Sequence, residues 1–259
     1  MMQWKTLFQK ELQENWRNFK WVWVPLVIIL LSIMDPITTY YLPMIMEAAG
    51  GLPEGAVFEI PTPKIHEVVM MSLGQLSSLG VFIIVLISMG VIAGERKSGV
   101  AELVLVKPVS YRNYITSKWV SLLLLVWVSL FLGMLTTWYY INLLFGDLSL
   151  TSIIQVTFFY GLWYTLVITF SIFYNTLVKT PGLVAAFTII TIMVMSILTQ
   201  IFNHILTWSP NTISEHIQSM LVTGEVSTDL IATSFITVIF IIVLLMTSIF
   251  TIQTKELAN

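Results

Sequence analysis

Few residues of this sequence have both the type and the spacing that catalysis requires. The stretch His66–Met70 begins like the helix of a zinc protease, but Met70 stands where the second histidine ligand would be. The remaining histidines, His204 and His216, add no metal-ligand spacing. The sequence contains neither a G-x-S-x-G nucleophile motif nor a G-x-x-x-x-G-K-[ST] phosphate-binding loop. We therefore expect no catalytic residue, no metal and no bound cofactor on this chain.

One carboxylate lies well inside an apolar run. An acid at the centre of a spanning helix costs about 2.5–3.5 kcal/mol, so Asp35 is a candidate residue of a translocation path. In that case it should face a water-lined cavity or a polar partner such as Thr38 or Ser32. Alternatively, Asp35-Pro36 starts a turn, the helix ends at Met34, and Asp35 lies at the outer interface.

The elements that must hold such residues are membrane-spanning helices. Of 259 residues, 57% are hydrophobic and 10% are charged, and there is no cysteine to form a disulfide; a soluble domain has about 25% charged residues. A spanning helix needs about 20 apolar residues, and continuous apolar runs argue against the alternating strands of a membrane barrel. We expect an all-α polytopic protein, a single transmembrane domain over residues 1–259. The six predicted spans are Trp21–Leu42, Met70–Ala93, Trp119–Phe145, Thr151–Val178, Gly182–Leu206 and Leu230–Ile252.

Lysine and arginine are sorted to one side of these spans. Of the 12 basic residues, all but Lys64 lie in the N-terminal arm, between the second and third spans, between the fourth and fifth spans, or in the C-terminal tail. Because basic segments stay on the cytoplasmic side, we expect a multi-pass plasma-membrane protein with both termini in the cytoplasm.

The N-terminal arm, residues 1–20, is too short to span. Its large apolar residues recur at three- and four-residue spacing, which predicts an amphipathic helix; they are Trp4, Leu7, Phe8, Leu12, Trp16 and Phe19. We expect this helix to lie in the membrane interface with lipid as its partner. The alternative is a helix that packs on the protein's own cytoplasmic side.

Two predicted outer segments are longer than turns. Residues 43–69 are rich in proline and glycine, which predicts an irregular loop. Residues 207–229 contain apolar side chains on one helical face, and Gly224 can end that helix. We expect a short amphipathic helix beside the outer leaflet.

Residues 94–118 concentrate charge between the second and third spans. The pattern predicts a short helix, a break at Lys107-Pro108, and a second helix capped by Ser110 that continues into the third span. Basic residues alone would hold this loop in the cytoplasm. They do not account for its Val/Leu face or its internal break.

This stretch resembles the cytoplasmic loop of permease subunits of type-2 ABC exporters, which carry a Glu-Arg-x-x-Gly segment, a short Glu-Leu helix and Pro-Val-Ser before the third span. The matching residues are Glu95, Arg96, Gly99, Glu102, Leu103, Pro108, Val109, Ser110 and Lys118. The N-terminal helix, the six spans, the cytoplasmic termini and the longer segment before the sixth span also match that family's layout.

The resemblance implies a coupling function for this loop. A separate cytoplasmic ABC ATPase, carrying ATP and Mg, would receive a coupling helix from each of two permease copies or paralogues. The residues implied to contact it are Glu95, Arg96, Gly99, Glu102, Leu103, Pro108, Ser110 and Arg112. We expect no nucleic-acid partner.

Two other classes of protein remain open. An ATP-independent transporter or channel would need its own coupling groups, and Asp35 is the main one in the spans. A membrane-embedded enzyme is disfavoured by the missing motifs. The apolar spans with scattered Ser and Thr suit a hydrophobic or amphipathic substrate, which the sequence does not identify further.

Overall fold

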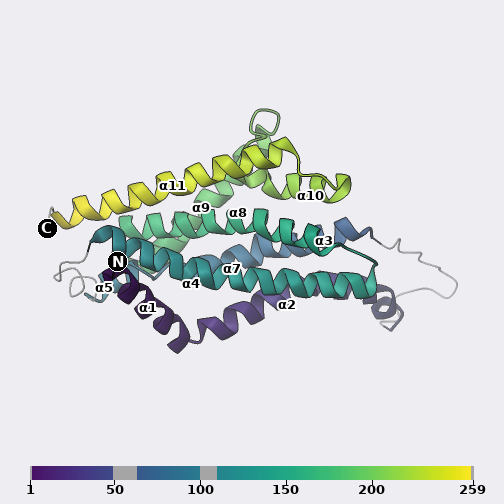
Figure 1. The fold of residues 1–259 in the computed structure, drawn as a ribbon, viewed down its shortest axis with the longest axis horizontal. Helices are drawn as coiled ribbons and strands as arrows, with labels where there is room; N and C mark the ends of the chain where they lie inside the picture. The colour runs from purple at the N-terminus through teal and green to yellow at the C-terminus, as the bar shows by residue number, and fades with distance from the viewer. Residues whose placement is uncertain (1, 49–62, 100–109, 258–259) are drawn as a thin grey trace.

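A computed structural model describes residues 2–48, 63–99 and 110–257, and these form an elongated helical bundle with both ends of the chain on the same side (Figure 1). The elements are α1 (Met2–Arg17), α2 (Lys20–Ala48), α3 (Ile65–Gln75), the π-helical turn η1 (Leu76–Gly80), α4 (Val81–Ser88), α5 (Ala93–Lys97), α7 (Tyr111–Leu144), α8 (Leu150–Leu177), α9 (Pro181–Ile201), the 3-10 turn η2 (Pro210–Thr212), α10 (Ile213–Thr223) and α11 (Thr228–Leu257). Within the described residues, six segments are long and apolar enough to cross a membrane. The predicted all-α, six-span architecture is confirmed.

Helix α8 lies at the centre of the bundle. It contacts α4, α7, α9, α10 and α11, and most of its side chains are buried. Two indole N–H groups of α7 donate to its hydroxyls, Trp119 to Thr169 and Trp127 to Thr165, each at 3.0 Å. These bonds satisfy polar groups that would be costly in lipid.

Helices α2 and α7 pack closely. A Cβ atom added at Gly133 of α7 would lie 2.6 Å from the Ser32 hydroxyl, so only glycine allows this approach. Pro36 lacks the N–H that would bond the carbonyl of Ser32, and the Thr137 hydroxyl donates to that carbonyl instead, at 3.0 Å. Of the two alternatives for Asp35, the one in which the helix ends at Met34 is therefore wrong, since α2 continues to Ala48.

The second span is interrupted by the π-helical turn η1. The hydroxyl of Tyr164 donates to the carbonyl of Leu76 at 2.8 Å, and the carbonyl also accepts the N–H of Val81. Gly80 lies directly against the Tyr164 hydroxyl, where a Cβ atom would collide with it. A glycine on one helix and a tyrosine on its neighbour thus accommodate the widened turn.

The predicted outer segments are corrected in part. The irregular loop is shorter than residues 43–69, because α2 ends at Ala48 and α3 begins at Ile65; residues 49–62 lie outside the described part of the chain. Helix α10 forms as expected, and it ends at Gly224 in the left-handed conformation, with φ of 78°. Its buried face packs on α3, α8 and α11 of the protein itself.

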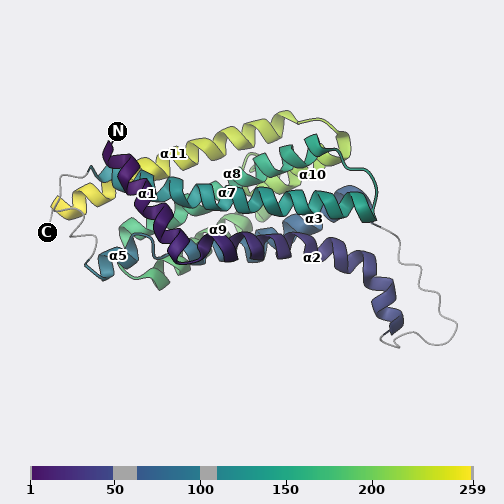
Figure 2. The ribbon, with the colours of Figure 1, turned by 60° about the horizontal axis from the view of Figure 1, so that its bottom comes forward.

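Helix α1 is set at an angle to α2 and lies across the end of the bundle (Figure 2). The chain turns between the two helices at Phe19, with φ of 55°. The most buried side chains of α1 are the polar Glu11 and Asn15, whereas Trp16, and Phe19 in the turn that follows, are exposed. The helix therefore turns a polar face to the bundle, and Trp16 lies on its outer face.

Candidate functional site

The short helix α5 lies at the end of the bundle that holds both termini (Figures 1 and 2). It follows a turn over residues 89–92 that closes α4, and it precedes residues 100–109, which lie outside the described part of the chain. It ends at Lys97, and two residues later Gly99 has a φ of 77°, a left-handed conformation that glycine adopts without strain. Its side chains Glu95 and Arg96 belong to the family-like segment found in the sequence.

Glu95 is tied to two other helices. One carboxylate oxygen accepts from Lys10 of α1 at 2.6 Å and from Lys118 of α7 at 2.9 Å, and the other accepts the Tyr114 hydroxyl at 2.6 Å. The side chain of Glu95 is only 12% exposed. α1, α5 and α7 therefore meet at this one carboxylate.

A second carboxylate completes the cluster. Glu11 accepts from Lys118 at 2.8 Å and from Lys10 at 3.1 Å, and Glu14 lies 3.4 Å from Lys10 at the exposed rim. We call Lys10, Glu11, Glu95, Lys118 and Tyr114 the charged cluster. Its two lysines and two glutamates balance in charge, which is the arrangement that makes a nearly buried lysine tolerable.

The ion pairs also shift the titration of Lys10. Burial alone would lower the pKa of Lys10, but the hydrogen bonds and charges of Glu95 and Glu11 outweigh burial and raise its pKa above the ordinary value. Lys10 is therefore charged throughout the physiological pH range, and the pairs it makes persist there.

Helix α1 reinforces the same contact with neutral hydrogen bonds. Asn15 donates to Ser121 at 3.0 Å, and the indole of Trp4 donates to Thr116 at 3.1 Å. Trp4, Glu11 and Asn15 are spaced by seven and four residues, so they share one face of α1.

A buried asparagine of α8 holds the start of α5. The side-chain oxygen of Asn175 accepts the backbone N–H groups of Ile92 at 3.1 Å and Ala93 at 2.8 Å, and its amide donates to the carbonyls of Ser88 and Ser171. Three of these bonds satisfy the backbone where α4 stops and α5 begins, and the fourth, to Ser171, lies within α8.

Arg96 makes a further tie to α8. Its guanidinium donates to the carbonyl of Thr176 at 2.9 Å. Because Glu95 binds α1 and α7 while Arg96 binds α8, α5 is connected to three helices at once.

The predicted coupling residues lie in different surroundings. Glu95 and Arg96 contact the protein's own helices, and Gly99 follows the end of α5. Ser110 stands at the N-cap position of α7, but its side chain makes no capping hydrogen bond, contrary to expectation. A separate group, Glu102, Leu103 and Pro108, lies outside the described residues, and Arg112 is exposed on the first turn of α7.

Several members of the charged cluster, and Asn175 beside it, were not singled out from sequence. Lys118 was noted only as part of the family motif, and Lys10, Glu11, Tyr114 and Asn175 were not assigned a role. The sequence did contain one indication, which lies in α1. Glu11 shares a helical face with Trp4, and a carboxylate on such a face needs a buried partner of opposite charge. Nothing local identifies that partner, because it lies on another span.

Asp35 is half-buried within α2 and accepts a hydrogen bond from Gln75 of α3 at 3.3 Å. Its partner is therefore neither of those expected. Thr38 and Ser32 donate instead to backbone carbonyls of their own helix.

The fold and the cluster define a multi-pass helical membrane protein in which a short charged helix is tied to the ends of the spans. A family model described as "ABC-2 family transporter protein" matches residues 5–218, from α1 into α10. The chain is similar to "Uncharacterized transmembrane protein YxlG" of Bacillus subtilis (strain 168), with 31% identity over 219 residues that cover 85% of each chain. The chain belongs to the ABC-2 transporter family, as its resemblance indicated, and is a membrane permease subunit of that family. Membership implies an ATPase partner in the complex.

Proposed function

We propose that this chain is the permease of an ABC exporter that moves a hydrophobic or amphipathic substrate, and that α5 passes the motion of a separate cytoplasmic ATPase to the spans. The chain itself catalyses no reaction, and ATP and Mg belong to the partner. The segment of residues 98–112, with Glu102, Leu103, Pro108 and Arg112, is the proposed ATPase-binding element.

One observation carries the coupling proposal. The helix that leads into this segment is bonded to α1 and α7 through Glu95 and to α8 through Arg96 and Asn175. Breaking a buried ion pair by removing one partner costs about 3–5 kcal/mol. A force on the segment therefore moves α5 and the attached helix ends together more easily than it separates them.

The sidedness of the chain supports the same proposal. The family-like segment and both termini lie at one end of the bundle (Figure 1), and all but one of the 12 basic residues belong to segments at that end. By the positive-inside rule, that end is cytoplasmic, where an ATPase can bind it.

The absence of cysteine from the sequence allows a direct test of sidedness. We expect Ser98→Cys to resist, and Glu225→Cys to react with, a membrane-impermeant maleimide added to intact cells, since both positions are exposed at opposite ends. Permeabilised cells should label at both positions. Labelling of Ser98→Cys in intact cells would reverse the proposed orientation.

Coupling is tested with the full chain, tagged and isolated from its native membrane in mild detergent. We expect an ABC ATPase to co-purify, Glu102→Ala to reduce its recovery, and Glu95→Gln to retain the ATPase while ATP-driven transport is lost. Glu225→Gln is the matched control. Transport that persists in cells expressing this chain without any ABC ATPase would refute the proposal in favour of an ATP-independent transporter.

A further inference from the structure

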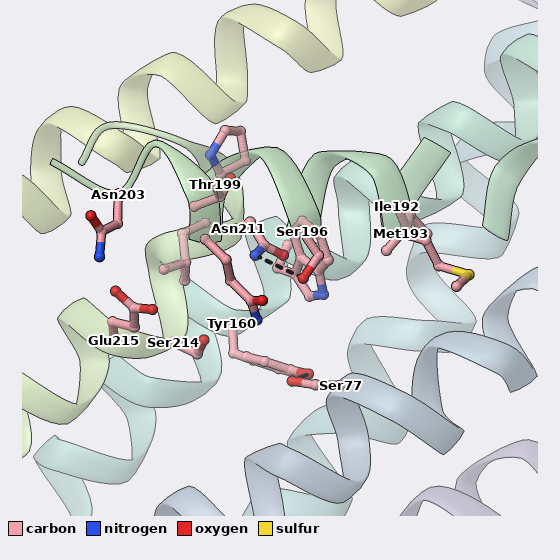
Figure 3. A pocket seen from close by; sticks show the side chains of 14 residues that line it. Ser77, Tyr160, Ile192, Met193, Ser196, Thr199, Asn203, Asn211, Ser214 and Glu215 are labelled. Atoms are coloured by element: carbon pink, nitrogen blue, oxygen red, sulfur yellow. Dashed lines mark hydrogen bonds between the residues drawn. The ribbon is translucent and has the colours of Figure 1, made fainter. Parts of the chain in front are cut away.

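A cavity of about 510 Å³ lies beside α10, which is at the end of the bundle remote from α5 (Figure 1). Side chains of α8, α9, α10 and the π-helical turn surround it (Figure 3). Tyr160 and Trp163 of α8 are buried and form its inner wall, whereas Asn203 and Glu215 are exposed at its mouth. It is thus a site open at the predicted outer side.

The cavity has one polar end and one apolar end. Figure 3 shows Asn203 and Glu215 at one end and Ile192 and Met193 at the other. Between them, Asn211 donates to Ser196 at 3.5 Å, and Ser77 shares a hydrogen bond of 2.9 Å with Tyr160. A bound molecule would meet polar groups at the end with Glu215 and apolar side chains farther along α9, where Ile192 is half-buried and Met193 is exposed.

Electrostatics determine which polar head fits. Glu215 is the only charged side chain among the described residues that line the cavity, and none of these is Lys, Arg or His. The adjacent His216 is directed to the backbone carbonyl of Thr207, at 2.9 Å. A cation at the mouth would gain a counter-charge, whereas a phosphate or sulfate would meet a carboxylate and no cation.

The π-helical turn contributes to the wall. Ser77 belongs to η1 and is an exposed residue within a span, where polar groups are expected to face a cavity or another polar group. Its bond to Tyr160, together with that of Tyr164 to Leu76, holds this wall in place.

We propose that this cavity binds a cationic amphiphile, with its ammonium group beside Glu215 and its apolar chain along Ile192 and Met193. The assignment of that amphiphile as a transported substrate rests on the proposed function. Binding itself requires only the permease and is measured without any ATPase.

The test uses full-length protein in phosphatidylcholine nanodiscs and three probes that share an octyl chain: octyltrimethylammonium, octyl glucoside and octyl sulfate, each below its critical micelle concentration. Isothermal titration should show saturable binding of the ammonium probe in preference to the other two. Glu215→Gln should weaken it about fivefold, the upper range for an exposed ion pair, and Glu215→Lys should transfer the preference to octyl sulfate. Glu225→Gln, an exposed acid outside the cavity, should have no effect.

A second variant tests the apolar end. Met193→Trp should weaken binding of the ammonium probe, because the larger side chain fills the apolar end of the cavity. The preference for the ammonium probe over octyl sulfate should not change. Equal binding of octyl sulfate to the native protein, or unchanged ammonium binding by Glu215→Gln, would overturn the site. Failure of an ATPase to co-purify while ammonium binding persists would overturn the proposed function and leave the site standing.

Discussion

Replacing Lys118 with methionine removes the central cation of the charged cluster while keeping a side chain of similar length. Lys118 is 2% exposed and pairs with Glu11 at 2.8 Å and with Glu95 at 2.9 Å. Removing one partner of a buried pair costs about 3–5 kcal/mol. Lys10 still lies 3.1 Å from Glu11 and 2.6 Å from Glu95 and compensates part of the lost charge, so we expect a cost at or just below the lower limit of that range, about 2–3 kcal/mol.

The change should be measured as thermal stability of the purified full-length protein in mild detergent. At about 2–4 °C per kcal/mol for a large domain, the apparent melting temperature should fall by about 5–10 °C. Lys97→Met, an exposed lysine of α5, is the matched control and should change it little.

A double-mutant cycle separates the ion pair from general disruption. Glu11→Gln combined with Lys118→Met should cost less than the sum of the single changes, with a coupling energy of about 1–3 kcal/mol. A melting temperature of Lys118→Met equal to that of Lys97→Met, or purely additive effects in the cycle, would refute the argument that the cluster joins α1, α5 and α7.

Three further predictions address other parts of the bundle. Asn175→Ala should speed hydrogen exchange at the start of α5, because two backbone N–H groups lose their acceptor; unchanged exchange there would contradict its holding function. Gly80→Ala should destabilise the protein by roughly 1–3 kcal/mol through its collision with Tyr164, and Tyr164→Phe should partly restore the melting temperature in that background; a tolerated alanine would show that the π-helical turn can relax. The pKa of Lys10 is raised in the folded protein. Its ion pairs therefore contribute fully to folding stability at any pH below the pKa of an ordinary lysine, and this contribution disappears only as the pH rises through the raised pKa. The difference in melting temperature between native protein and Lys10→Gln should thus stay constant from about pH 6 to 9, and a difference that disappears within this window would contradict the ion-pair assignment.

Local sequence predicted the end of one helix correctly and was misleading about the end of another. Gly224 was correctly predicted to end α10, because a left-handed residue is a local requirement that glycine meets. Pro36 was expected to allow the helix to end, but its effect depends on whether another group can bond the carbonyl it leaves free. Thr137, on a different helix, does so, and α2 continues.

The candidate site was located but not resolved by sequence. The segment with Glu95 and Arg96 was singled out from its concentration of charge between the second and third spans. Its residues were assigned to an ATPase partner, and that contact remains a prediction. Their bonds to α1, α7 and α8 could not be foreseen, since Asn175 and Lys10 are ordinary polar residues until the chain brings them beside α5.

Sequence by itself determined the class, the number of spans and the family of this protein, because apolar length and motif spacing are properties of contiguous segments; its charge distribution also predicts the sidedness. Tertiary structure decided which charges neutralise one another and where the backbone of a span departs from an α-helix. Lys118 and Glu11 are 107 residues apart, and Tyr164 and Leu76 are 88 apart. Such pairs depend on how helices pack, and in a membrane each buried polar group must find its partner through that packing.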